Sequence, residues 1–93
     1  MIENEVETYF TKRVKEAGGW PLKFTSPGTS GMPDRLVIWA DGRVMFVELK
    51  RPGKKPRALQ EEVHKKLNLF KQTVCTINTK AKVDAFVVKW CRI

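Results

Sequence analysis

Residues 35–50, RLVIWADGRVMFVELK, contain the pattern that decides the fold. Two runs rich in β-branched and aromatic residues flank the pair Asp41-Gly42, which is a strong hairpin signal. Both runs are nearly continuous in apolar residues, as expected for strands that helices cover on both faces. We therefore expect Arg35–Trp39 and Arg43–Lys50 to form the centre of a sheet.

Helical and strand patterns continue on both sides of this hairpin. Apolar residues at helical intervals stop at Gly18-Gly19, where a left-handed helix end costs least. The expected elements are a helix over Glu3–Ala17, strands over Trp20–Thr25, Arg35–Trp39 and Arg43–Lys50, a helix over Arg57–Phe70, a strand over Thr73–Ile77, and a last helix that Asn78 or Thr79 caps. This αβββαβα order predicts an α/β fold with a mixed sheet, in one domain spanning residues 1–93.

Length and composition exclude several classes of protein. The chain has 93 residues and is 42% hydrophobic, which is too apolar for a disordered segment. No apolar run approaches the roughly 20 residues of a membrane helix, and the first residues do not resemble a signal peptide. We expect a cytoplasmic protein, acting in the host cytoplasm if a phage encodes it. Cys75, Cys91 and His64 are too few for a zinc site, which needs about four such ligands.

The charge is uneven along the chain. Eighteen Lys and Arg against ten Asp and Glu give a net charge of +8. Residues 1–50 hold seven basic and seven acidic residues, so the excess lies entirely in residues 51–93. Such a balance favours a polyanionic partner, and the two halves are expected to perform different tasks on one domain.

Two carboxylates and an ammonium are expected to meet at one end of the hairpin. Glu48 and Lys50 share a face because side chains alternate along a strand. Taken alone, they could form an ordinary surface pair. Asp34 opens the partner strand, with thirteen residues between it and Glu48, and the hairpin brings it close. Two carboxylates held together repel one another unless a cation such as Mg²⁺ lies between them.

These residues resemble a known family. Pro33-Asp34 followed by Glu48-Leu49-Lys50 is similar to the PD-(D/E)XK signature of the restriction-endonuclease-like nucleases, whose core has the same αβββαβα order. The wider set resembles the VRR-NUC domain, a small nuclease module. It comprises an early Glu before an apolar position, Gly31-Met32-Pro33-Asp34, Glu48-Leu49-Lys50 followed by Arg51-Pro52-Gly53, and Gln60.

The resemblance implies a role for each matching residue. Asp34 and Glu48 would bind Mg²⁺ or Mn²⁺ with the main-chain carbonyl of Leu49, and Lys50 would orient or deprotonate the attacking water. Gln60 would position the scissile phosphate or a ligand, although Pro56-Arg57 stand where the family has a small hydroxyl residue. The first helix offers three candidates for a further metal ligand: Glu3, preferred because Val6 follows it at +3, then Glu7, and last Glu5.

The expected partner is DNA, held by its backbone and shape. Arg51, Lys54, Lys55 and Arg57 follow the acidic cluster directly and would clamp phosphates. Stand-alone family members imply a homodimer that cuts four-way (Holliday) junctions, with exposed tryptophans among Trp20, Trp39 and Trp90 as candidates for the dimer face. The alternatives are a general nickase or flap nuclease, a non-catalytic basic DNA-binding module, and a protein-interaction domain.

Overall fold

The computed structural model describes the backbone of residues 2–91 and the side chains of residues 5–91. Its elements are α1 (Ile2–Glu16), β1 (Gly19–Lys23), β2 (Arg35–Trp39), β3 (Val44–Leu49), α2 (Ala58–Leu69), β4 (Val74–Ile77) and α3 (Lys80–Trp90). The predicted αβββαβα order is confirmed, with element ends that differ by one or two residues. Gly18 has a left-handed φ of 89° after α1, and the Thr79 side chain accepts a hydrogen bond from the Lys82 N–H at the start of α3.

The four strands form one mixed sheet in the order β1-β2-β3-β4. The first three are antiparallel, and β4 runs parallel to β3. Arg35 lies opposite Val47, and Glu48 lies opposite Thr76. The start of β2 and the ends of β3 and β4 therefore lie at the same edge of the sheet.

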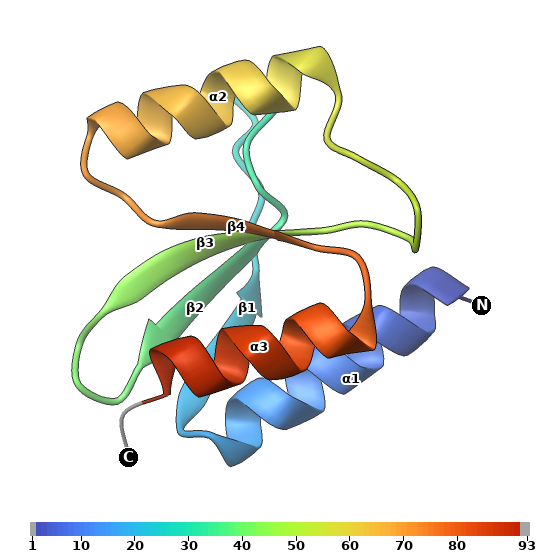
Figure 1. The fold of residues 1–93 in the computed structure, drawn as a ribbon. Helices are drawn as coiled ribbons and strands as arrows, with labels where there is room; N and C mark the ends of the chain where they lie inside the picture. Colours follow the sequence, from blue (N-terminus) through green and yellow to red (C-terminus); the bar gives the residue numbers. More distant parts are fainter. Residues whose placement is uncertain (1, 92–93) are drawn as a thin grey trace.

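One face of the sheet carries the hydrophobic core. Helices α1 and α3 lie side by side across this face, and α2 lies on the opposite face (Figure 1). Phe86 of α3 links the two helices to the sheet, with ring centroids 5.9 Å from Phe10 and 6.0 Å from Trp39. Trp39 is 3% exposed, so the prediction that it could form an exposed dimer face is wrong. A continuous apolar strand does not reveal which of its residues point to the better-covered face.

The opposite face is only partly covered. A helix lies on each face of the hairpin as expected, but burial is incomplete on the α2 side, where alternate residues of β2 are only half-buried and α2 itself has no buried residue. The α2 face retains a groove of about 380 Å³ between the helix and the loop before β2. Leu69 and Phe70 lie at the end of α2 and are 79% and 67% exposed. The apolar side chains of α2 therefore pack against the rest of the protein only in part, and those at the end of the helix face solvent.

The loop between β1 and β2 packs against α2. Gly31 has a φ of +86°, and a Cβ at this position would come within 3.0 Å of the Leu59 and Val63 side chains. Only glycine meets both conditions without strain. This contact leads the chain to Pro33, which is fully buried, and so fixes the place where Asp34 enters β2.

Within residues 2–91, no helix has the length and apolar character required to cross a membrane.

Candidate active site

Glu48 is the centre of a polar cluster at the shared sheet edge. The residue is 3% exposed, although a carboxylate at this depth is costly unless it is paired. Its Oε2 atom lies 3.3 Å from the Lys50 Nζ and accepts a hydrogen bond of 3.1 Å from the Gln60 Nε2. Its Oε1 atom is buried and has no hydrogen-bond partner among the described residues.

Asp34 approaches the same point from β2. Its Oδ1 atom accepts a hydrogen bond of 3.0 Å from the main-chain N–H of Leu49, so the carboxylate is tied to the end of β3. Asp34 is exposed by surface area, yet partial loss of water around its carboxyl group raises its pKa. Burial also raises the pKa of Glu48, and the nearby charge of Asp34 adds to this effect. The Glu48 shift indicates that a second negative charge at this edge is unfavourable without further compensation.

This arrangement fits a divalent cation. Carboxylate oxygens are the ligands that Mg²⁺ prefers, and the unpartnered Glu48 Oε1 is a buried acceptor that a cation would satisfy. Among the described side chains, no group of three His, Cys, Asp or Glu residues is close enough to hold a metal alone. Mg²⁺ commonly keeps several waters and one or two carboxylates, so Asp34 and Glu48 are a sufficient protein contribution. The carbonyl of Leu49 remains a predicted ligand.

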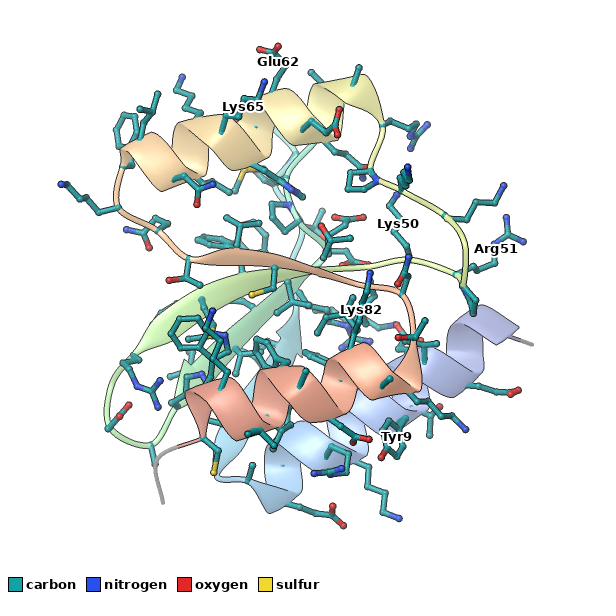
Figure 2. The ribbon with its side chains drawn as sticks, in the orientation of Figure 1. Tyr9, Lys50, Arg51, Glu62, Lys65 and Lys82 are labelled. Carbon is teal, nitrogen blue, oxygen red and sulfur yellow. The ribbon has the colours of Figure 1, made fainter. Side chains whose placement is uncertain are left out.

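Lys50 completes the cluster from the end of β3. Its side chain extends toward the α2 side of the sheet, as Figure 2 shows, and it is 18% exposed. Its charge also lowers the pKa of His64 on α2, although burial of the imidazole is the larger cause. The ammonium group is therefore partly shielded from water and faces the carboxylates.

Gln60 joins α2 to this site. Its Oε1 atom accepts a hydrogen bond of 2.9 Å from the Arg57 N–H at the start of the helix, while its Nε2 donates to Glu48. One side chain thus caps α2 and orients a candidate metal ligand. In this structure Gln60 positions a carboxylate, and its predicted contact with a phosphate remains a prediction.

The first helix brings Glu7 to the site. The Glu7 carboxylate forms an ion pair with Arg35, and its charge acts on Asp34. Glu5 is exposed, and the side chain of the preferred candidate, Glu3, lies outside the described residues. The choice between Glu3 and Glu7 stays open, with Glu7 already placed near Asp34.

Arg35 is a site residue that sequence reasoning missed. It is 6% exposed and shares the core face of β2 with Val37 and Trp39. Strand alternation alone places Arg35 on that face, and a charged side chain there needs a partner. A charged residue at a core-facing position of a predicted strand was therefore the sequence feature that could have identified Arg35.

The predicted DNA-binding residues lie on the loop between β3 and α2. Arg51, Lys54, Lys55 and Arg57 are all exposed, and none forms an ion pair with another residue in the described part of the chain. The Asn78 side chain donates a hydrogen bond of 2.9 Å to the Lys54 carbonyl and holds the loop against the end of β4. Arg51 projects from this loop directly after Lys50 (Figure 2).

Comparisons with known proteins agree with this geometry. No family model matches the chain. The chain is 37% identical over 78 residues, 84% of each chain, to "Putative nuclease p44" of Acyrthosiphon pisum secondary endosymbiont phage 1. It also resembles a solved structure described as "VRR_NUC domain", with a TM-score of 0.89, 30% sequence identity, and coverage of 97% of this chain and 98% of that chain. With its PD-(D/E)XK residues gathered at one sheet edge, the chain belongs to the VRR-NUC family of nucleases.

Proposed function

We propose that the protein is a Mg²⁺- or Mn²⁺-dependent endodeoxyribonuclease. The observation that carries the proposal is the buried Glu48, which lies beside Asp34 and Lys50 and whose Oε1 atom has no hydrogen-bond partner among the described residues. A buried carboxylate beside a second, exposed one, both with raised pKa values and next to an ammonium, is typical of a site that binds a cation and handles a proton.

The side chains divide the work of phosphodiester hydrolysis. When bound, the divalent ion neutralises phosphoryl oxygens and lowers the pKa of water. Asp34 and Glu48 would hold the ion, and Gln60 keeps the Glu48 carboxylate oriented. Lys50 would orient the attacking water and, as a neutral amine, accept the proton that the water loses. We infer products with a 5′-phosphate and a 3′-hydroxyl.

The basic loop would hold the DNA backbone beside these groups. Arg51, Lys54, Lys55 and Arg57 offer four cations without carboxylate partners among residues 5–91. Contacts with phosphates fix the position of DNA without reading its sequence. Recognition of DNA shape therefore suits this loop better than base readout does.

A four-way junction is the proposed substrate, and a cleavage assay tests it. We expect purified protein with Mg²⁺ or Mn²⁺ to cut a four-way junction faster than linear duplex or a flap. EDTA should abolish cutting. Asp34→Asn should lower the rate by more than about 100-fold, because even residues that only support a metal ligand typically cost 10–100-fold.

The outcomes of this assay separate the alternatives. Equal rates on the three DNA structures would favour the general nickase. Salt-sensitive DNA binding without cutting under any divalent cation would favour the non-catalytic module. Exposed Asp41→Asn, in the turn between β2 and β3, is a matched control and should keep the wild-type rate.

We propose further that two copies act as a homodimer, because one active site cuts one strand at a time and a junction has two strands to cut. Trp90 packs partly against the core, and Trp20 is exposed on β1. The α2 face offers a larger apolar surface, since Leu69 and Phe70 adjoin the apolar groove. A self-complementary contact between the α2 faces of two copies would cover Leu69, Phe70 and the groove.

A double substitution at the end of α2 tests the dimer. Leu69→Asp with Phe70→Asp places charges on this face, so the species found by sedimentation or light scattering should fall from twice the chain mass to one. Val88→Asp is the control, because Val88 is 80% exposed on α3, on the opposite face. A monomeric wild type, or a double variant that stays dimeric, would contradict the proposed interface.

A further inference from the structure

A second basic surface lies in the half of the chain that has no net charge. A groove of about 490 Å³ runs between α1 and β1. It is lined by Glu7, Thr8, Thr11, Lys12, Lys15, Lys23 and Arg35. Four of these seven side chains are cationic and only one is anionic, so the groove is positive although the surrounding sequence is balanced.

The carboxylate in the groove lining already has a cationic partner, because Glu7 pairs with Arg35. Lys12, Lys15 and Lys23 are exposed, and no carboxylate among the described side chains lies within ion-pair distance of them. Three ammonium groups are thus left to attract an anion from outside.

The register of β1 and β2 concentrates this charge. Lys23 lies directly opposite Arg35 in an antiparallel pair, so both side chains leave the sheet on the α1 face. Like charges directly opposite one another are unfavourable. Glu7 compensates Arg35, while Lys23 has no such partner within residues 5–91. An anion bound between Lys23 and the lysines of α1 would remove this cost.

The groove approaches the active site at Arg35, which follows Asp34 in the chain. Glu7 lines the groove, and its charge also acts on Asp34. From Glu7 to Lys15, α1 extends by about 12 Å at 1.5 Å per residue. A duplex whose axis runs parallel to α1 would present about three phosphates of one strand over that length, at about 3.4 Å per phosphate along the duplex axis. A strand leaving the active site could therefore follow α1 past Lys12 and Lys15.

We propose that this groove, lined by Lys12, Lys15 and Lys23, binds the phosphate backbone of DNA next to the cut. The proposal rests on the proposed nuclease function and adds a second contact surface to it. The groove opens on the α1 face of the sheet, whereas the loop with Lys54 leads to α2 on the other face. The two basic surfaces would hold the substrate on both sides of the scissile phosphate.

The salt dependence of binding tests the groove. We compare the variant Lys12→Gln/Lys15→Gln/Lys23→Gln with the control Lys65→Gln/Lys71→Gln/Lys89→Gln, which removes the same charge from exposed positions on α2, just after α2, and on α3. Fluorescence anisotropy with a labelled four-way junction in EDTA measures affinity without cutting. Each lost phosphate contact lowers the slope of log K against log salt by about 0.9.

We expect the groove variant to lose about two to three units of slope, and at least about tenfold in affinity at low salt, relative to the control. Equal slopes for the two triple variants would overturn the groove. The cleavage assay tests the nuclease separately: no cutting by wild type would overturn the proposed function, while a slope difference would still support a DNA contact here. Melting curves for both variants exclude loss of folding.

Discussion

We expect Lys50→Met to lower the rate of DNA cleavage by about 10²- to 10⁴-fold, the usual contribution of a positioned acid or base. Methionine keeps much of the length of lysine but cannot carry a proton or a charge. The Lys50 Nζ lies 3.3 Å from Glu48 Oε2, on the α2 side of the sheet where the attacking water would have to be held. Single-turnover cleavage at saturating protein measures this step apart from DNA binding.

Two further variants identify what Lys50 does. Lys50→Arg keeps the positive charge but holds its proton throughout the accessible pH range. If Lys50 exchanges a proton, arginine should not restore the rate; if it acts only as a fixed charge, arginine should restore most of it. Lys65→Met is the matched control, because Lys65 is exposed on α2 and lies outside the proposed active site and the basic loop. A wild-type rate for Lys50→Met would remove Lys50 from the mechanism.

The hairpin and the site at its end could be predicted from sequence because they depend on short-range rules. The Asp41-Gly42 turn sets the pairing of β2 with β3, and strand alternation places Glu48 and Lys50 on one face. Because Asp34 directly precedes β2, it must lie at the edge of the sheet where β3 ends. The structure brings these three residues together as the spacing indicated.

The partial cover of the α2 face could not be predicted in this way. The stripe of Leu59, Val63 and Leu67 specifies an amphipathic helix but does not say how closely it approaches the sheet. The contact of Gly31 with Leu59 and Val63 sets part of that approach, and it joins segments far apart in the chain. Burial of Trp39 depends on α1 and α3, and its strand alone is apolar on both faces.

The pairing of Glu7 with Arg35 is long-range as well. Sequence spacing offered three glutamates on the first helix, and only the packing of α1 on the sheet shows which described one reaches β2. The same packing forms the groove between α1 and β1. The net charge of residues 1–50 is zero and so does not reveal this basic groove, because a sum does not show which cations lack a carboxylate partner in the folded protein.

The second large effect concerns stability, and we expect Glu48→Gln to stabilise the protein in EDTA at neutral pH. Burial and the charge of Asp34 raise the Glu48 pKa in the folded protein above its ordinary value of 4.5. An acid with a raised folded pKa destabilises the fold wherever it is ionised, so glutamine relieves a cost at neutral pH. That advantage should shrink as pH falls through the raised pKa and vanish below the ordinary value.

A divalent cation should reverse this order. At a Mg²⁺ concentration 100 times its Kd, binding to the folded state adds about 2.7 kcal/mol. In a domain of this size each kcal/mol moves Tm by about 4–8 °C, so wild type should gain roughly 10–20 °C and Glu48→Gln much less. Exposed Glu62→Gln on α2 keeps the pair intact and should respond like wild type (Figure 2).

Thermal melts with EDTA, Mg²⁺ or Mn²⁺ at several pH values separate the two contributions. If Glu48 lowers Tm in EDTA but raises it when a cation binds, its role is to bind the cation, and it lowers the stability of the metal-free protein. If Mg²⁺ and Mn²⁺ leave the wild-type Tm unchanged, the acidic pair does not bind these ions. If Glu48→Gln lowers Tm in EDTA, the hydrogen bond from Gln60 and the ion pair with Lys50 outweigh burial and repulsion. The sign of the Tm difference between Glu48→Gln and wild type in EDTA therefore shows whether Glu48 stabilises the metal-free protein or destabilises it.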